Sequence, residues 1–357
     1  MKVLLFGGTG AMGRSLVNFL LQEGDEVDIT TRSSVTSHNS SVKYIQGDAH
    51  SLDFITPILA KHYDVIIDFM VYSTKEFSAR YEMFLNNTGL YVFLSSARVY
   101  ANCNEKLTEN SPRLLDTDID SQYLSSDEYA LAKARQENML FSSPMKNWLI
   151  IRPYITYNDN RLQFGTYEKE CWLYRVLHGQ TVVFLQDIFE RFTTMTSGVD
   201  VANIICKLSH LAISNDVFHV TTNESVKWKE IWNIYAAAVK KTKGYAPRLL
   251  LVDDEKLYMR SVGNPCQLQY DRMFNRIFDN TKVMKHVGNY SFEKIEIGLT
   301  NALTSFLNHT EIKLYPPAKY LAYSDKFSRE WSNIWELNSL SEIMKYLYHR
   351  FSWKSTT

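Results

Sequence analysis

The sequence predicts an α/β protein: a doubly wound parallel sheet followed by a smaller C-terminal α/β subdomain. Through the first two-thirds of the chain, short apolar runs alternate with stretches of helical periodicity, which is typical of a parallel sheet with helical crossovers. The cores of these runs are almost unbroken by polar residues, as expected of strands covered on both faces. The predicted strands are 2–6, 26–30, 42–46, 65–69, 91–94, 148–151 and, returning later to the same sheet, 217–221.

Helices are expected between and after these strands because apolar residues there recur every three to four positions. They comprise 12–23, 74–86, 126–141, 228–241 and 292–307. The final stretch, 311–357, is an aromatic-rich extension. Leu340, Ile343, Leu347 and Phe351 fit one helical face, so we expect this extension to dock onto the body or onto a partner subunit.

Composition excludes several classes of protein. The 357 residues carry 39 basic and 39 acidic side chains, so no global field draws the chain to nucleic acid or to an anionic membrane. The four cysteines are widely spaced, which favours reduced thiols over a disulfide or a metal site. The chain starts on a predicted strand and has no apolar stretch of membrane-spanning length. We therefore expect a cytoplasmic protein that binds neither membrane nor nucleic acid.

A glycine-rich turn directly follows the first predicted strand and opens the first helix. Its glycines, Gly7, Gly10 and Gly13, suit a sharp turn, a close approach of backbone to a pyrophosphate and tight packing of helix on sheet. The helix N-terminus then offers free N–H groups and partial positive charge to phosphates. This position predicts a dinucleotide site, and its expected contacts are Gly7, Thr9, Gly10, Ala11, Met12 and Gly13.

The end of the second strand indicates which dinucleotide is bound. An NAD site normally has an acidic residue at this tip to bond the adenine ribose, but here the tip is Thr31-Arg32 and Asp28 comes too early. Arg32 and Ser33 are suited to holding a 2′-phosphate, which predicts NADP(H). Asp48, after the third strand, is placed either to contact the adenine end or to form an ordinary surface turn.

A tyrosine and a lysine four residues apart, Tyr129 and Lys133, lie on one face of a predicted helix. A nearby ammonium favours the phenolate, which suits a tyrosine to proton transfer. The same spacing recurs at 290–294 and 315–319, where Pro316-Pro317 argues against a helix in the latter. Only Tyr129 follows a strand-like run that ends in hydroxyls, at Ser95 and Ser96.

Taken together, these motifs resemble those of the extended short-chain dehydrogenase/reductases, in the branch that acts on nucleotide sugars. The resemblance covers about residues 1–310 and rests on Gly7-x-x-Gly10-x-x-Gly13, Ser95-Ser96-Ala-Arg-Val-Tyr100, Tyr129-x-x-x-Lys133 and Arg152-Pro153. It implies a Rossmann-type fold with Ser96 as catalytic hydroxyl and Tyr129 as acid/base. Lys133 would hold the nicotinamide ribose and tune Tyr129. It also implies a homodimer formed by the Tyr129 helix and by 74–86, with Phe77, Tyr81 and Phe84 on one stripe.

Differences between this sequence and the motifs of each enzyme type in the branch indicate which activity to expect. The 4,6-dehydratases carry Thr-Asp-Glu where this chain has Ser96-Ala97-Arg98, so the acids for water elimination are missing. Epimerases usually keep NAD and an acidic tip on the second strand. The stretches 123–137 and 147–157 resemble reductases of dTDP-4-keto-6-deoxyglucose, an activity of surface-polysaccharide and lipopolysaccharide O-antigen biosynthesis. The resemblance thus implies NADPH-dependent reduction of the 4-keto group of a nucleotide-linked 4-keto-6-deoxyhexose.

Two alternatives remain open at this point: a nucleotide-sugar 4-epimerase, and a non-catalytic dinucleotide- or RNA-binding protein of the same fold, such as the stem-loop-binding relatives. The ligand of the substrate phosphates is also open. Arg191 precedes the segment ending Asp200-Val-Ala202, though two residues further upstream than the family pattern, and Arg272, Arg276 and Arg161 compete with it. The expected division is an NADP-binding domain, 1–157, completed by about 194–225; a mainly substrate-binding subdomain, 158–310; and the extension, 311–357.

Overall fold

The computed structural model describes residues 1–8, 10–288, 290–309 and 311–352. The chain divides into two compact units, each assembled from separate segments. Unit 1 contains residues 1–156, 194–224 and 277–293, and unit 2 contains 157–193, 225–276 and 294–357. This differs from the expected division in two places: 277–293 belongs with the sheet, and the extension belongs with unit 2.

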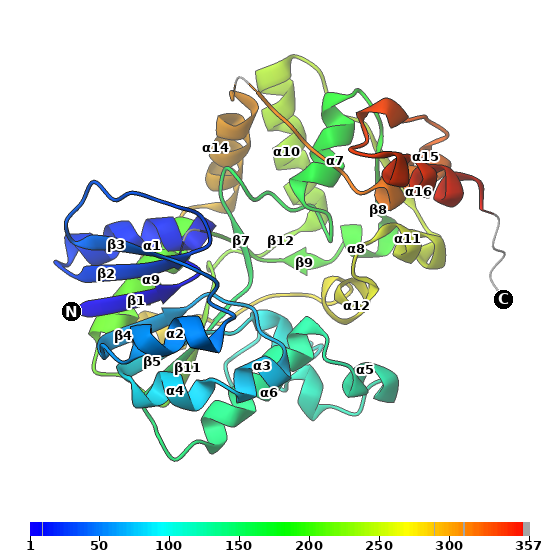
Figure 1. Ribbon diagram of the computed structural model, residues 1–357. Coiled ribbons are helices and arrows are strands. Elements are labelled where there is room, and N and C mark those ends of the chain that lie inside the picture. Colours follow the sequence, from blue (N-terminus) through cyan, green and yellow to red (C-terminus); the bar gives the residue numbers. More distant parts are fainter. Residues whose placement is uncertain (9, 289, 310, 353–357) are drawn as a thin grey trace. The chain divides into compact units, whose positions relative to one another are not determined.

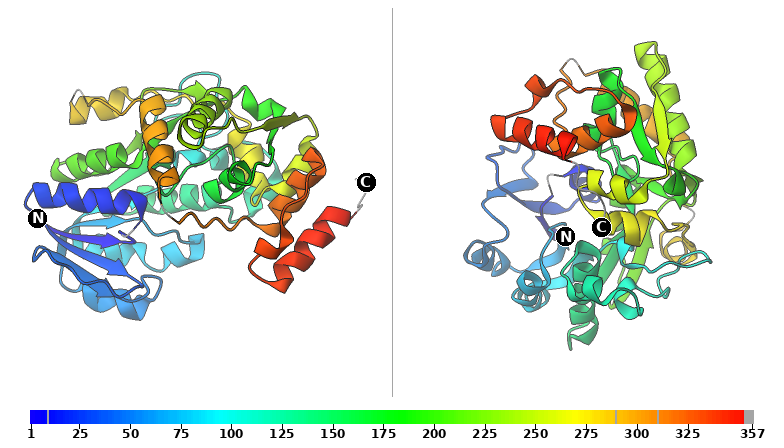
Figure 2. Two further views of the ribbon diagram at one scale, coloured as in Figure 1. Left: turned by 90° about the horizontal axis from the view of Figure 1, so that it is seen from above. Right: turned by 90° about the vertical axis from the view of Figure 1, so that its right-hand side faces the viewer.

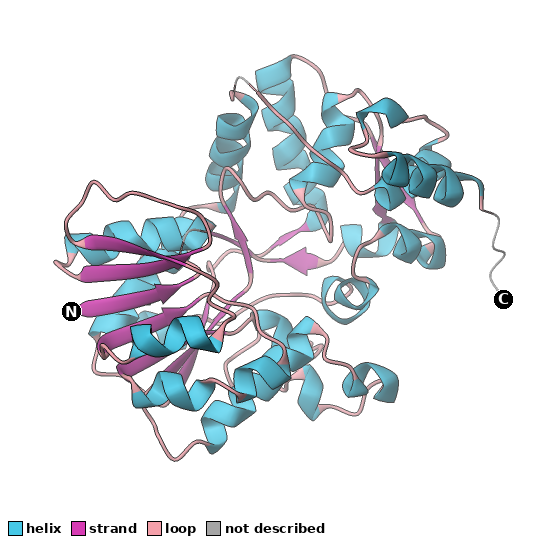
Figure 3. Cartoon of the chain, viewed as in Figure 1, coloured by secondary structure: helices cyan, strands magenta, loops and turns pink. Residues whose placement is uncertain are grey.

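Unit 1 is built on a seven-stranded sheet in which every neighbouring pair is parallel (Figures 1 and 3). The strand order is β11-β6-β5-β4-β1-β2-β3. This confirms the predicted fold class and all seven predicted strands. Their bounds are β1 (Lys2–Phe6), β2 (Glu26–Thr31), β3 (Val42–Gln46), β4 (Tyr63–Asp68), β5 (Thr88–Leu94), β6 (Trp148–Pro153) and β11 (Asp216–Val220).

Both faces of the sheet are covered because successive strand residues point to opposite sides. In β1, Val3 and Leu5 enter one apolar core, while Leu4 and Phe6 enter the other. Three helices cover the first face (Figures 1 and 2): α1 (Ala11–Gln22), α9 (Gly198–His210) and α13 (Thr281–Val287). The second face packs against α2 (Leu52–Leu59), α3 (Thr74–Ser78), α4 (Tyr81–Asn86) and α6 (Tyr129–Ser142).

The segment 74–86, expected to be a single helix with Phe77, Tyr81 and Phe84 on one stripe, is broken into α3 and α4 at Arg80. The Arg80 guanidinium is buried, stacks on the Tyr72 ring at 4.4 Å and donates a hydrogen bond to the backbone oxygen of His50 at 3.1 Å. Phe77 and Phe84 are fully buried in the core of unit 1. Two of the three rings expected on one stripe at a dimer interface therefore cover the sheet instead.

Residues 277–293 belong to unit 1 because α13 packs on the sheet. Lys282 of α13 donates to the carboxylate of Asp216 and to the backbone oxygen of Val217, both in the edge strand β11. Asp200, at the start of α9, accepts hydrogen bonds from the Tyr290 hydroxyl at 2.7 Å and the Glu293 amide at 2.9 Å. The helix α9 itself was not among those expected from the sequence.

Unit 2 is mainly helical and has an aromatic core, with rings such as Phe164, Trp172 and Trp228 almost fully buried. Two small sheets pair β8 (Val182–Leu185) with β13 (Leu249–Val252) in parallel and β9 (Phe192–Thr193) with β12 (Val226–Lys227) antiparallel. Its helices are α7 (Lys169–Leu177), α8 (Gln186–Phe189), α10 (Trp228–Lys243), α11 (Glu255–Ser261), α12 (Pro265–Gln267), η3 (Leu268–Arg272), α14 (Ile295–Leu307), α15 (Ala318–Ser328), η4 (Ile334–Glu336) and α16 (Leu340–Phe351).

The remaining elements are short. They are η1 (Ala97–Val99), η2 (Leu114–Asp116), α5 (Ser121–Ser125), β7 (Ile155–Tyr157) and β10 (Met195–Ser197). Across the described ranges, none of the helices combines the length and the apolar character needed to cross a membrane.

Candidate functional site

The turn between β1 and α1 needs glycine at two positions, one for its backbone dihedral angle and one for close packing. Gly7 has φ of +72°, a region that residues with a side chain rarely adopt. At Gly13, an added Cβ would lie 2.3 Å from the backbone oxygen of Gly8, so only glycine lets α1 pack this closely on the turn.

The start of α1 fits a dinucleotide phosphate. Gly10 is the N-cap and supplies no capping side chain, and an added Cβ at Gly10 would meet no atom within 4 Å. Backbone N–H groups at such a helix start are suited to anionic oxygens. Met12 packs against the apolar core beneath. Thr9, also predicted as a contact, lies outside the described residues, as does the side chain of Ala11.

The tip of β2 leaves Arg32 and Ser33 exposed, while Thr31 is buried and accepts a hydrogen bond from the Ser33 amide at 3.2 Å. Asp28 accepts a hydrogen bond from the Tyr63 hydroxyl at 2.7 Å, so this acid has a structural partner away from the tip. Asp48 is exposed and caps a local turn by accepting the His50 amide at 3.0 Å. The exposed side chain at the strand tip is thus a cation.

Tyr129 is the first residue of α6 and is half-buried. The preceding residue, Glu128, caps the helix by accepting the Ala130 amide at 2.8 Å. Arg98 donates to Glu128 at 2.8 Å, and its guanidinium carbon lies 5.2 Å from the centre of the Tyr129 ring. A guanidinium, fixed by this ion pair, therefore lies beside the phenol.

Lys133 lies one helical turn after Tyr129 and is almost fully buried. Its ammonium donates to the backbone oxygens of Leu94 at 2.7 Å and Met70 at 3.4 Å, and lies 4.4 Å from the centre of the Phe93 ring. Burial lowers the pKa of Lys133 to about 8, against the opposing influence of the carboxylates of Asp68 and Glu137. Near neutral pH this lysine is a cation that can lose its proton readily.

The two serines at the end of β5 have different partners. Ser95 donates to the buried carboxylate of Glu137 at 2.6 Å. Ser96 accepts the Arg98 amide at 3.2 Å as the cap of η1. A hydroxyl that accepts from the backbone can still donate to a ligand, so Ser96 is better suited than Ser95 to bond a substrate oxygen.

Two buried acids near this site were not identified from the sequence. Glu137, fully buried on α6, accepts from Arg152 at 2.8 Å and from Arg113 at 3.1 Å. Asp68, at the end of β4, accepts the Tyr91 hydroxyl at 2.8 Å and the Met70 amide at 2.9 Å, and burial raises the pKa of this carboxyl. The signal that could have found Asp68 is an acid that ends an otherwise apolar strand beside the site.

The candidate phosphate ligands lie in unit 2 and have different environments. Arg272 is buried, pairs with Asp271 and donates to the backbone oxygen of Gly165 at 2.9 Å. Arg276 is also buried and bonds the same Asp271 at 2.8 Å. Arg191 is exposed. The two buried guanidinium groups stabilise unit 2, which leaves Arg191 the better candidate. Over the described residues, no group of three or more His, Cys, Asp or Glu side chains is arranged to hold a metal.

Curated relatives match parts of the chain. A UDP-glucose 4-epimerase from Streptococcus mutans is 33% identical over 79 residues, 20% of this chain and 24% of that protein. The chloroplast stem-loop binding protein of 41 kDa b from Arabidopsis thaliana is 24% identical over 249 residues, 65% of this chain and 58% of that protein. The chain therefore spans about a quarter of the length of the first relative and somewhat more than half of the second.

Solved structures share the fold over most of the chain. The Bordetella bronchiseptica enzyme WbmH in complex with NAD+ matches with a TM-score of 0.65 at 13% identity, over 87% of this chain and 99% of its own. The UDP-glucose 4-epimerase from Thermotoga maritima with UDP-glucose matches with a TM-score of 0.63 at 16% identity, over 86% and 98%. The family model described as "NAD dependent epimerase/dehydratase family" matches residues 3–185, just over half of the 357 residues. This chain therefore belongs to the NAD dependent epimerase/dehydratase family.

Proposed function

We propose that this protein is an NADPH-dependent reductase of the 4-keto group of a nucleotide-linked 4-keto-6-deoxyhexose, with a dTDP-sugar favoured. The observation that carries the proposal is the Arg98 guanidinium beside the Tyr129 ring, with the Lys133 ammonium one helical turn further along α6 in unit 1. Reduction of a ketone needs a proton donor whose anion is stabilised, and it needs no second acid for elimination. Tyr129 beside a cation supplies the proton donor with a stabilised anion. Position 98 is an arginine, so the acid that elimination would need is absent from this motif.

The chain's own groups have distinct roles in this proposal. Tyr129 hydrogen-bonds the carbonyl oxygen and donates its proton as the oxygen becomes an alkoxide. Ser96 donates a second hydrogen bond to the same oxygen. Lys133 and Arg98 stabilise the phenolate left on Tyr129. When bound, NADPH supplies the hydride that reduces the carbonyl carbon.

The proposed cofactor contacts lie at the two strand ends already described. The glycine turn and the start of α1 hold the pyrophosphate, and Arg32 with Ser33 binds the 2′-phosphate that distinguishes NADPH from NADH. Asp48 contacts the adenine end. The exposed Arg32 supports this choice, since no acid occupies the strand tip.

The substrate contact that we assign is the one to its pyrophosphate. A nucleoside diphosphate needs at least one cation for its pyrophosphate. Arg191 is exposed, whereas Arg272 is engaged by Asp271 and Gly165 within unit 2. We therefore assign the pyrophosphate contact to Arg191.

Absorbance of NADPH, followed with 4-keto-6-deoxyhexoses linked to dTDP, GDP, UDP or CDP, tests the proposal. NADH is assayed in parallel, and Tyr129→Phe serves as the control that removes the proton donor. Turnover with one nucleotide, a preference for NADPH and a loss of about 10²-fold or more in Tyr129→Phe are expected. No oxidation of either cofactor with any of the substrates would refute a reductase.

A nucleotide-sugar 4-epimerase is the second candidate, favoured by the similarity to the Streptococcus mutans UDP-glucose 4-epimerase. A tightly held cofactor that survives dialysis, together with inversion at C4 of a nucleotide sugar without net oxidation of NADPH, would support it.

The similarity to the stem-loop binding protein favours a third candidate, an RNA-binding protein without catalysis. Retention of RNA on a filter by both the wild type and Tyr129→Phe, without turnover of any sugar nucleotide, would support that one.

A further inference from the structure

The C-terminal helix α16 attaches to unit 2 through one face and leaves an apolar face exposed. The inward contact is Tyr346, which is fully buried and donates to Asp325 at 2.6 Å. The stripe expected to dock is instead largely outside: Leu340 is 76% exposed, and Leu347 and Phe351 are exposed as well. The extension therefore docks onto unit 2 through Tyr346 and not through the predicted stripe.

The exposed apolar side chains of this region are here called the tail face. Met344 of α16 is 66% exposed, and Trp335, in η4 packed against α16, is 80% exposed. Trp331 joins them, because its ring centre lies 5.9 Å from that of Phe351. The tail face comprises Trp331, Trp335, Leu340, Met344, Leu347, Tyr348 and Phe351.

The tail face is large for an apolar patch that is left in water. Each of its four aromatic side chains is more than half exposed. At about 150–250 Å² for an aromatic side chain, those four rings alone expose roughly 500 Å². The largest patch of a typical monomer is about 300–600 Å², and here two leucines and a methionine add to the rings. A patch of this size indicates contact with a second apolar phase or surface.

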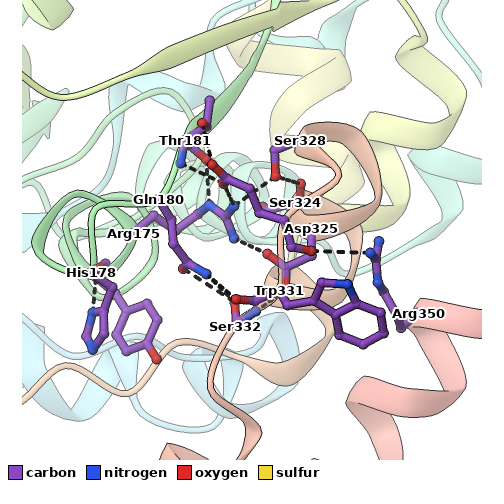
Figure 4. A network of polar contacts seen from close by, with 12 residues as sticks. Arg175, His178, Gln180, Thr181, Ser324, Asp325, Ser328, Trp331, Ser332 and Arg350 are labelled. Atoms are coloured by element: carbon purple, nitrogen blue, oxygen red, sulfur yellow. Dashed lines mark hydrogen bonds and ion pairs between the residues drawn. The ribbon is translucent and has the colours of Figure 1, made fainter.

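A buried polar network holds the segment that carries this face (Figure 4). Arg175 of α7 and Asp325 of α15 are both fully buried and form an ion pair at 2.7 Å. Asp325 also accepts the Ser332 amide at 2.7 Å, and Glu330 accepts from Arg175 at 2.9 Å. The tail face is thus presented by a stably folded part of unit 2.

Cations flank the apolar face of α16 on both sides. With about 3.6 residues per turn, Lys345 falls on one flank of this face and Arg350 on the other. Lys345 pairs with Glu342 at 2.6 Å. The Arg350 guanidinium carbon lies 4.6 Å from the centre of the Trp331 ring, and Arg350 donates to the backbone oxygen of Glu330 at 3.2 Å. Cationic side chains in such positions can reach lipid headgroups while their apolar stems stay with the neighbouring rings.

Further cations lie where α15 and α16 meet. Lys326 of α15 donates to the backbone oxygen of Ser352, just beyond the end of α16, at 3.1 Å. Burial and the positive charge of Arg350 lower the pKa of Lys326. Burial and the positive charges of Lys319 and Lys326 likewise lower the pKa of His349. Basic groups from both helices therefore create a positive field next to the tail face.

The acids of this region compensate little of that field. Residues 318–352 contain five Lys or Arg and four Asp or Glu. Two of these acids pair with Arg175 and Arg248, which lie outside the range. In the sequence, residues 343–357 contain three Lys or Arg and no Asp or Glu. The net charge of zero over the whole chain therefore does not describe this local surface.

An aromatic face with adjacent cations fits a membrane surface better than a protein partner. Trp and Tyr are enriched where a bilayer meets water, because their rings are apolar and one edge is polar. An amphipathic helix with Lys or Arg beside such a face lies in the plane of the bilayer surface, its apolar side chains buried by about 5–10 Å. A protein interface would have to desolvate the same cations, and lysine is depleted at the core of protein interfaces.

We propose that the tail face is a membrane-docking surface, which attaches unit 2 to an anionic lipid bilayer. The helix α16 lies in the plane of the bilayer surface, with Leu340, Met344 and Leu347 directed toward the acyl chains. Lys326 and Arg350 contact the anionic headgroups. This revises the expectation that the chain binds no membrane, which rested on its net charge.

Co-sedimentation of the full chain with vesicles tests this proposal. The wild type should bind vesicles of phosphatidylserine and bind those of phosphatidylcholine more weakly. Added NaCl should weaken the binding to phosphatidylserine, since the Debye length falls from about 10 Å at 0.1 M to about 3 Å at 1 M.

A pair of double variants identifies the surface that binds. Trp335→Ser/Leu340→Ser removes the two most exposed side chains of the tail face and should lower the partition coefficient by about 10-fold or more. Val199→Ser/Ile297→Ser removes two exposed apolar side chains from α9 and α14 and should bind as the wild type does. Circular dichroism of both should match the wild type, because all four positions are exposed.

Three results would overturn the proposal. The first is a wild type that stays in the supernatant with phosphatidylserine vesicles, including the case in which it self-associates instead. The second is equal binding to the two kinds of vesicle. The third is a tail-face variant that binds as well as the variant of α9 and α14. None of these readouts uses enzymatic activity, so they do not depend on the proposed reaction.

Discussion

The carboxylate of Glu137 accepts hydrogen bonds from both Nε and Nη2 of Arg152, each at 2.8 Å, one helical turn beyond Lys133. Arg113 and Ser95 bond the same carboxylate at 3.1 and 2.6 Å. Because Ser95 directly follows β5, Arg152 belongs to β6 and Glu137 belongs to α6, this network fixes the helix of Tyr129 against the ends of two strands. The Arg152-Pro153 motif of the sequence is, in the structure, an anchor for α6.

Glu137→Gln tests this anchor. The substitution leaves the buried Arg152 guanidinium without its anion and removes one of the two carboxylates of Arg113, so the free energy of unfolding should fall by about 3–5 kcal/mol. Urea denaturation monitored by tryptophan fluorescence measures the change. Asp116→Asn is the control, since it removes a half-exposed partner of Arg113 and should cost about 1 kcal/mol or less. Equal effects of the two substitutions would contradict a central role for Glu137.

Lys133→Met tests the burial of the ammonium through the pH dependence of stability. Burial lowers the folded pKa of Lys133 to about 8 from its ordinary value of 10.5, so between these two values the unfolded chain binds more protons than the folded one. Stability therefore rises with pH in that window, and below pH 8 the cost of burying the charge is fully present. The wild type should gain roughly 3 kcal/mol relative to Lys133→Met between pH 8 and 10.5. A flat difference between the two unfolding curves would be inconsistent with a buried ammonium.

Arg98→Gln tests the cation beside Tyr129. Without the guanidinium the phenolate is less favoured, so the pH of half-maximal kcat/KM for alcohol oxidation should rise by about one unit. Arg98→Lys retains a cation and should keep the midpoint near that of the wild type. A lower rate with an unchanged pH profile in Arg98→Gln would mean that Arg98 acts only through the position of Glu128.

Arg32→Glu tests cofactor selection. Losing a charge-assisted contact to the 2′-phosphate should weaken NADPH binding by about 2–3 kcal/mol, and a carboxylate at the strand tip should favour NADH. Titrations that follow quenching of tryptophan fluorescence give both dissociation constants. Lys43→Glu, an equal charge change at an exposed position of β3, is the control and should leave the preference intact.

The fold was predictable because its signals are local. Apolar runs such as Val65–Ile67 mark strands buried on both faces. Glycine is required at position 13 because an added Cβ would collide with the backbone of Gly8. The seven strands follow from these signals without knowledge of their partners. Tyr129 and Lys133 were identifiable for the same reason, since their spacing along a helix fixes their common face.

The features that were missed depend on contacts distant in sequence. The carboxylate of Glu137 is important because Arg113 and Arg152 converge on it from other elements, and neither spacing nor composition indicates that. Phe77 and Phe84 have the spacing of a surface stripe, and only the tertiary structure shows that the sheet covers them. The inward face of α16 is likewise set by one hydrogen bond, from Tyr346 to Asp325, rather than by its most apolar stripe.

The most direct test of the proposed reaction is the transfer of deuterium from NADPH labelled at C4 of the nicotinamide to a 4-keto-6-deoxyhexose nucleotide. The account predicts a 6-deoxyhexose with one deuterium at sugar C4, formed with one NADPH oxidised per product when both hydrogens at C4 of the cofactor are labelled. Recovery of the keto sugar without deuterium and without consumption of NADPH would contradict the reductase. Inversion at C4 of a nucleotide sugar that carries a 4-hydroxyl, again without consumption of added NADPH, would then identify an epimerase.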